Sequence, residues 1–381
     1  MSHLNTAESS PSLLTTASTG FGTVAQALAA LAEGHPVVVV DGQDSESTGD
    51  LIFAASVATP EVVGFCIRHT SGVLRTAMDS ETSARLQLPL MAASDSETTG
   101  AFTVSVNAKA VVSAGISAAD RTVTIRTLAD PETEPLDLNR PGQIFPLRTR
   151  EGGVLNHPGH PEAAVDLATM AGLPPVAALS EIVTDGGDLA CGADLLQFAT
   201  EHELVMISIS DIVEFRRHHE PLVTHRGTAR MPTAHGMFAA HAFTELFGDN
   251  EHFVMTMGDV SDGGPALAHI HVECLLGDTF GSALCECRTD LDMAVRNIAD
   301  EGRGVLVYLR DAGSTDAGLF DDRNAGQVTA PHSHTAGICA QILRELGVHS
   351  LRLMTNSTVS HHDLQSYGID IVERLPLPSG R

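Results

Sequence analysis

The chain has 381 residues, 43% of them hydrophobic, so it is long enough for two domains with apolar cores. Its formal net charge of −26 argues against nucleic acid and anionic membrane surfaces as partners, because both bind basic faces. No run of about 20 apolar residues predicts a membrane span, and residues 1–20 lack the basic and apolar parts of a secretory signal. We therefore expect a disordered leader over 1–20 and a cytoplasmic protein.

The first half of the chain alternates helical and strand patterns, which predicts a mixed α/β domain over residues 21–220. Ser117 followed by Asp120 is a capping-box pattern and indicates the start of a helix. Helices are predicted over 24–33, 60–70 and 117–128, strands over 35–41 and 102–107, and a helix, a strand and a helix in turn over 194–220.

The second half begins with a polar segment rich in Pro and Gly, residues 221–236, which we interpret as a linker and an entry strand. Strands are predicted over 253–257, 266–273, 304–310, 350–354 and 369–374, and helices over 289–300 and 335–347. This pattern predicts a second mixed α/β domain over 221–381. The fold class expected for the whole chain is α+β, with two such domains.

Three of the six cysteines are clustered in the second half. Cys274, Cys285 and Cys287 have the spacing C-x10-C-x-C. In a reducing compartment such clustering indicates a metal site rather than disulfides. Zinc takes about four tetrahedral ligands, so three protein thiolates leave a position for water. The alternative is three buried thiols that pack as small hydrophobic groups.

Longer motifs resemble two known enzyme families. A resemblance to GTP cyclohydrolase II is seen in the segments HVECLLGDTFGSALCEC, IADEGRGVLVYLR and YGIDIVERLPL. A resemblance to the 3,4-dihydroxy-2-butanone 4-phosphate synthase family is seen in the segments FGTVAQALAALAEGHPVVVVD, GISAADRTVTIR, NRPGQIFPLR and GHPEAAVDLATMAGL. The order of the halves is that of the bifunctional riboflavin-biosynthesis fusion. The resemblance implies Zn²⁺ at the three cysteines, a small-molecule substrate and a homodimer.

The resemblance also implies site residues in the first half. Glu46 and His160 match the ligands of a Mg²⁺ or Mn²⁺ ion in the synthase family. Asp50 and Glu181 match active-site carboxylates. This set is suited to a hard cation with carboxylates beside it, so we expect Glu46, Asp50, His160 and Glu181 to be the catalytic residues.

Other positions of this site depart from the family pattern. Ser45 and His157 replace arginines, Thr48 replaces a glutamate, Ser113 replaces a threonine and Gln143 replaces a histidine. We expect Ser45, Thr48, His157 and Ser113 to contact the substrate. Because a sugar phosphate is normally clamped by Arg or Lys, the missing arginines predict a different substrate or a different binding mode.

The second half departs further from its family. His269 and Asp290 replace an arginine and a glutamine, Ala312 and Ser314 replace the charged residues of an E-G-R segment, and the only tyrosines are Tyr308 and Tyr367. We therefore expect GTP cyclohydrolase activity to be lost while zinc persists. His332 and His334 either supply a fourth zinc ligand or a base, or belong to an exposed loop.

Three functions are compatible with this pattern. The favoured one is a diverged, neofunctionalised enzyme of specialised metabolism. It would be a metal-dependent lyase or isomerase that acts on a small hydroxyketone or sugar-phosphate-like substrate. One alternative is a non-catalytic paralogue that binds a ligand or a partner through the retained scaffold. The other is a zinc-dependent hydrolase with a new substrate in the second domain.

Overall fold

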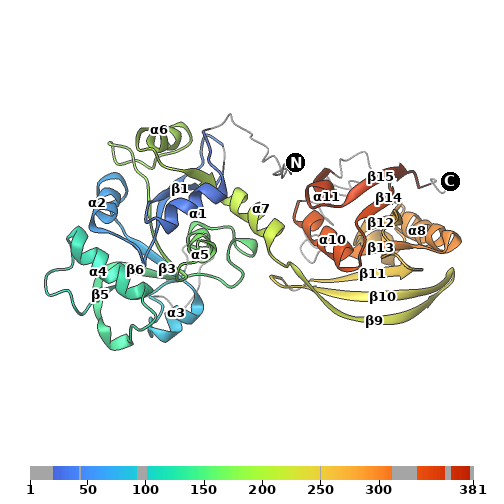
Figure 1. Cartoon of the computed structure of the whole chain (residues 1–381), viewed down its shortest axis with the longest axis horizontal. Helices are drawn as coiled ribbons and strands as arrows, with labels where there is room; N and C mark the ends of the chain where they lie inside the picture. Colours follow the sequence, from blue (N-terminus) through green and yellow to red (C-terminus); the bar gives the residue numbers. More distant parts are fainter. Residues whose placement is uncertain are drawn as a thin grey trace, which may run out of the picture. The chain divides into compact units, whose positions relative to one another are not determined.

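The computed structural model describes residues 20–42, 44–91, 101–248, 250–310, 333–356 and 362–377 (Figure 1). The chain divides into two compact units between Ile212 and Val213. Each unit has its own sheet with helices packed against it, which confirms the predicted fold class of two mixed α/β domains. Within the described residues no helix is both long enough and apolar enough to cross a bilayer.

A mixed sheet organises the first unit. Among the described residues its strands follow the order β4-β6-β3-β7-β2-β1-β8, and β5 pairs with β6. The strands are β1 (Val37–Val40), β2 (Gly49–Ala54), β3 (Arg75–Met78), β4 (Ala101–Phe102), β5 (Val106–Ala108), β6 (Leu138–Arg148), β7 (Val176–Glu181) and β8 (Met206–Ser208). The helices are α1 (Val24–Ala32), α2 (Pro60–His69), α3 (Ser80–Arg85), α4 (Ala118–Ala129), α5 (His160–Met170) and α6 (Ala193–Glu201), with 3₁₀ turns η1 (Pro135–Asp137) and η2 (Gly153–Leu155). Helix α7 (Ile209–His219) contains the boundary between the units.

The central strands of this sheet are buried on both faces. Every residue of β1 and β2 is buried. Leu51 and Phe53 face a core that includes residues of α2, α4 and α6. Helix α5 packs against β1, β2, β3 and β7 with residues outside that core. Because side chains alternate across a strand, the two sets cover opposite faces, and the four valines form the buried strand that their sequence predicted.

The first unit differs from one local prediction and confirms another. The strand expected over 102–107 is divided into β4 and β5, and the register between β5 and β6 shifts between Val106 and Asn107. Ser117 does cap α4 by accepting the N–H of Asp120. The carboxylate of Asp120 is occupied by two hydrogen bonds, which the hydroxyl groups of Ser113 and Ser117 donate.

The second unit is built on another mixed sheet, whose order among the described residues is β15-β14-β12-β13-β11-β10-β9. Its strands are β9 (Val223–Thr233), β10 (Gly236–Glu245), β11 (Glu251–Met257), β12 (Ala266–Val272), β13 (Gly304–Leu309), β14 (Ser350–Met354) and β15 (Asp370–Leu375). Its helices are α8 (Cys287–Glu301), α10 (Ser333–Glu345), α11 (His362–Ser366) and the π-helical turn η3 (Leu275–Thr279). The segment expected to be a linker and an entry strand, 221–236, is largely strand β9, because it pairs along its length with β10 in a long hairpin (Figure 1).

A buried threonine ties α4 to β5 and generates a stability prediction. Thr124 is fully buried, and its hydroxyl accepts the N–H of Ala108 at 3.0 Å. Thr124→Val keeps the side-chain shape but leaves that N–H without its acceptor, so we expect a loss of about 1–3 kcal/mol in urea unfolding. Thr127→Val is the control, because it removes the hydrogen bond that the Thr127 hydroxyl donates within α4, at a less buried position. Its free energy of unfolding is expected to stay within about 0.5 kcal/mol of wild type. Equal losses in the two variants would contradict the assignment.

Candidate functional site

One end of the first sheet gathers two carboxylates and a guanidinium. Asp50 of β2 is paired in register with Glu181, the last residue of β7. Arg75, the first residue of β3, places Nη2 at 2.8 Å and 2.9 Å from the two carboxylate oxygens of Asp50. Its Nη1 lies 3.2 Å from Oε1 of Glu181. Three side chains from three strands therefore form one ion trio.

The charge of Asp50 depends on this trio. Asp50 is only 1% exposed, and burial raises the pKa of its carboxyl group. His160, in its protonated form, and Arg75 oppose that rise, and the negative charge of Glu181 adds to it. A buried carboxylate is stable only when a close partner compensates its lost hydration. Arg75 is that partner.

His160 lies at the same end of the sheet, at the first position of α5. Its Nε2 atom is buried and has no hydrogen-bond partner among the described residues. Two residues later, the buried Glu162 accepts the N–H of Arg150 at 3.1 Å. An unpartnered buried imidazole nitrogen requires an explanation, and a neutral imidazole is a common metal ligand. The atom therefore fits the cation site that the sequence predicted.

The loop between β1 and β2 is bonded mainly to itself. Glu46 is exposed, and its N–H donates to Asp44. The hydroxyl of Ser47 and this N–H lower the pKa of Asp44. Thr48 donates its hydroxyl to Asp41 at 3.0 Å. Within the part of the chain that is described, the carboxylate of Glu46 has no bond to His160.

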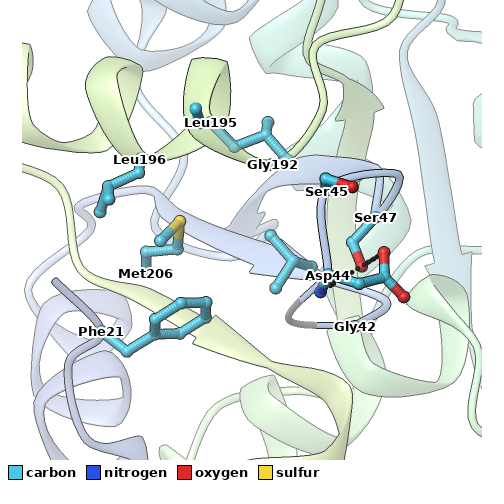
Figure 2. A pocket seen from close by; sticks show the side chains of 11 residues that line it. Phe21, Gly42, Asp44, Ser45, Ser47, Gly192, Leu195, Leu196 and Met206 are labelled. Carbon is cyan, nitrogen blue, oxygen red and sulfur yellow. Dashed lines mark hydrogen bonds between the residues drawn. The ribbon is translucent and has the colours of Figure 1, made fainter. Parts of the chain in front are cut away.

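A cavity of about 360 Å³ adjoins this loop. Figure 2 shows Asp44, Ser45 and Ser47 along one side, with Phe21 and Met206 on the apolar side. The wall is completed by Val40, Gly42, Gly192, Ala193, Leu195 and Leu196. Of the predicted substrate contacts, Ser45 borders this cavity. The carboxylates of the ion trio belong to a separate place at the sheet end.

The two remaining predicted substrate contacts have other positions. Ser113 donates its hydroxyl to Asp120 at 2.5 Å, at the exposed start of α4. His157 is partly buried in the turn that leads into α5, where its N–H donates to Gly153. Among the described contacts, neither side chain touches the ion trio. The structure thus brings together Asp50, Glu181 and His160 from the predicted set, and the substrate roles of the others stay predictions.

Arg75 is the residue of this candidate site that sequence reasoning missed. The sequence predicted a site without a cation, because its loop over 41–50 carries none. The structure corrects this for the sheet end, since Arg75 reaches Asp50 from a strand that is 25 residues away in the chain. The available signal was one arginine within VLRTAM (73–78), an otherwise uncharged strand-like run.

The three clustered cysteines meet in the second unit. Their sulfur atoms all lie within 4.8 Å of one another, and Sγ of Cys274 is 3.7 Å from Sγ of Cys285. Tetrahedral zinc with bonds of about 2.3 Å places two sulfur ligands about 3.8 Å apart. Cys274 precedes η3, and Cys287 begins α8. Among the described residues this is the only cluster of three or more such ligands at this spacing, so the donor set fits zinc better than separate thiols.

The backbone beneath the cysteines is closely fitted. A Cβ atom at Gly277 would lie 2.5 Å from Sγ of Cys285, so only glycine leaves room for the cluster. Asp278 accepts the N–H of Cys274 at 2.9 Å. Its carboxylate also bonds Nε2 of His271 at 3.0 Å and the hydroxyl of Tyr308 at 2.8 Å. These bonds hold the loop that presents the first cysteine.

Other residues singled out in the second half have structural contacts. His269 is buried in β12 and bonds the carbonyl of Met354 at 2.9 Å. Burial and the charge of Glu286 raise the pKa of Asp290 in the first turn of α8. Tyr367 donates its hydroxyl to Glu214 at 2.9 Å. Outside the described residues lie Ala312, Ser314, His332 and the side chain of His334.

Comparisons with known proteins assign each half of the chain to an enzyme family. The 3,4-dihydroxy-2-butanone 4-phosphate synthase family matches residues 25–215, and the GTP cyclohydrolase II family matches residues 224–376. The riboflavin biosynthesis protein RibBA of Nocardia farcinica is 44% identical over 378 residues, which cover 94% of this chain and 91% of that protein. RibBA of Salinispora arenicola is 44% identical over 376 residues, covering 94% and 90%.

A solved structure is similar along both units. RibBX, described as a two domain 3,4-dihydroxy-2-butanone 4-phosphate synthase from A. baumannii, has a TM-score of 0.74 and 29% identity, and the match covers 93% of this chain and 99% of that one. The matches span both units in the same order. The chain belongs to the riboflavin-biosynthesis fusion family, which joins a 3,4-dihydroxy-2-butanone 4-phosphate synthase domain to a GTP cyclohydrolase II domain.

Proposed function

We propose that the first domain is a divalent-cation-dependent lyase or isomerase that acts on a small hydroxyketone or sugar-phosphate-like substrate. The observation that carries this proposal is the buried, unpartnered Nε2 of His160 beside the trio of Asp50, Arg75 and Glu181. Membership of the synthase family supports the reaction class.

Glu46 and His160 would hold the cation. A carboxylate oxygen and an imidazole nitrogen suit Mn²⁺, and the carboxylate suits Mg²⁺. When bound, such an ion polarises a carbonyl or enediol oxygen of the substrate. Glu46 is exposed on its loop and is therefore free to turn toward a ligand.

Glu181 has the exposure that proton transfer requires. Its side chain is 45% exposed, whereas that of Asp50 is 2% exposed. In the proposed reaction the carboxylate accepts a proton from the hydroxyl-bearing carbon of the substrate. The electron pair of that C–H bond stays on the substrate as an enediolate, and the proton is later returned to the product.

The composition of the polar loop supports a substrate whose phosphate, if it has one, is not clamped by this loop. Ser45 and Thr48 carry no charge, and Thr48 already donates to Asp41. Phosphate is normally bound by charge-assisted bonds from Arg or Lys. The 44% identity to riboflavin-biosynthesis relatives nevertheless makes the pentulose phosphate of that pathway the first compound to test. A role in specialised metabolism, a homodimer and a cytoplasmic location stay predictions.

The second domain is proposed to bind zinc without turning over GTP. The spacing of Cys274, Cys285 and Cys287 supports zinc. Residues His269 and Asp290 support the loss of GTP turnover, since the resemblance places an arginine and a glutamine there. RibBX, which is similar over both units, is described as a synthase alone. No described contact favours a new hydrolase over a structural zinc ion.

Turnover in the first domain should require a divalent cation and His160. We expect the full-length chain to convert ribulose 5-phosphate, ribulose or a related hydroxyketone in Mg²⁺ or Mn²⁺, monitored by ¹³C NMR, and to stop in EDTA. His160→Ala should lower kcat at least about 100-fold, because the substrate then loses its polarising ion. His35→Ala is the control, since the side chain of His35 is 66% exposed and its ion-pair contact is with Glu33, which is not part of the site. Turnover that resists EDTA, or no turnover of any of these compounds, would refute the proposed function.

Zinc content should depend on the glycine beneath the cysteines. We expect about one zinc per chain by elemental mass spectrometry, with strong loss in Cys285→Ala and in Gly277→Ala. In the second variant the new Cβ occupies the space next to Cys285. Gly264→Ala is the matched control, because its Cβ would meet only ordinary contacts, the nearest at 3.4 Å. Full zinc occupancy in Gly277→Ala would argue against this geometry.

A further inference from the structure

Three strands place Asp50, Arg75 and Glu181 on one face of the first sheet. Strand β7 lies between β2 and β3; Asp50 pairs with Glu181, and Arg75 pairs with Leu179. Residues two apart on a strand share a face, so all three side chains project on the same side. Neighbouring strands lie about 4.8 Å apart, so Arg75 spans on the order of 10 Å across β7. Its guanidinium therefore passes over the strand that carries Glu181.

Arg75 engages the two carboxylates differently. One nitrogen, Nη2, lies within 2.9 Å of both oxygens of Asp50, whose side chain is 2% exposed. The other, Nη1, approaches one oxygen of Glu181, whose side chain is 45% exposed. Protonating Asp50 would break a buried ion pair and leave Glu181 as the only carboxylate of the trio that compensates the guanidinium. Glu181 keeps an oxygen that a substrate can reach.

We propose that Arg75 is a positioning residue, anchored by Asp50, that holds the Glu181 carboxylate in place for the substrate. Of the two carboxylates, Glu181 then moves the proton, and Asp50 acts through Arg75. This inference rests on the proposed function of the first domain and narrows it, because the sequence assigned proton transfer to both carboxylates.

The chemistry of the guanidinium suits this role. It is planar and carries five N–H donors in a rigid fork, so two of its nitrogens can bond two carboxylates at once. An ammonium group can pair with Asp50 but does not fix a second carboxylate in the same plane. Carboxylates directly opposite each other on adjacent strands repel. The positive charge of Arg75 offsets this repulsion, and the trio of Asp50, Arg75 and Glu181 has a net charge of −1. Glu181 can therefore stay beside Asp50.

A double-mutant cycle in the full-length chain tests the inference with the hydroxyketone that the wild type converts in Mg²⁺. We expect Glu181→Gln to lower kcat about 10²–10⁴-fold. Arg75→Met should lower kcat at least about tenfold and leave KM within about threefold. The double variant should be no slower than Glu181→Gln alone, within about threefold, because Arg75 acts through Glu181. Arg126→Met, which changes an exposed arginine of α4, is the control and should leave kcat unchanged.

Two kinetic results would overturn the inference. Losses that multiply in the double variant would show that Arg75 acts independently of Glu181. A rise in KM of more than about tenfold in Arg75→Met, with kcat intact, would show that Arg75 binds the substrate itself.

A second measurement needs no turnover and separates this inference from the proposed function. Arg75→Met leaves the buried charge of Asp50 without its partner, so the midpoint of thermal unfolding should fall by more than about 5 °C. The double variant Asp50→Asn/Arg75→Met should recover most of that loss, and Arg75→Lys should recover the midpoint but not kcat. If no compound is converted, the proposed function fails while this cycle still reports the anchor. An unchanged midpoint in Arg75→Met would refute the anchor.

Discussion

The bond between Asp50 and Arg75 is the polar contact on which the candidate site of the first domain depends. Asp50 belongs to a strand in which every residue is buried, and a carboxylate in such a place needs a cation to share its charge. That cation arrives from β3, on the far side of the central strand β7. The order of the strands and the chemistry of the site therefore depend on each other, and Glu181 and His160 complete the sheet end around the pair.

The second domain builds its site from one short segment. Cys274, the turn η3 and the first residue of α8 bring three sulfur atoms together within fourteen positions of the chain. Gly277 leaves the space that the sulfur atoms occupy, and Asp278 fixes the backbone that presents them. One site is thus formed by a folded sheet and the other by a folded loop. The two domains of a fused chain can consequently gain or lose function independently.

This contrast explains what the sequence could predict. The cysteine cluster was visible as a spacing, and the buried valines and the start of α4 at Ser117 were visible as local patterns. Arg75 was not, because nothing near it in the sequence identifies Asp50 as its partner, and the pairing requires the strand order. The segment that became β9 was interpreted as a linker with an entry strand, since its periodicity does not reveal the hairpin partner that it pairs with along its length.

The position of β7 in the sheet also has a consequence for how the chain folds. Asp50 and Arg75 flank a strand that ends only at Glu181, so the segments carrying them cannot assemble the trio by themselves. Contacts between such distant segments form late, after their loop-closure entropy has been overcome. Until β7 inserts, both side chains remain hydrated and neither is costly. We therefore expect Asp50 and Arg75 to be buried together when β7 joins the sheet, so that an assembled trio marks a first domain whose central strands are in place.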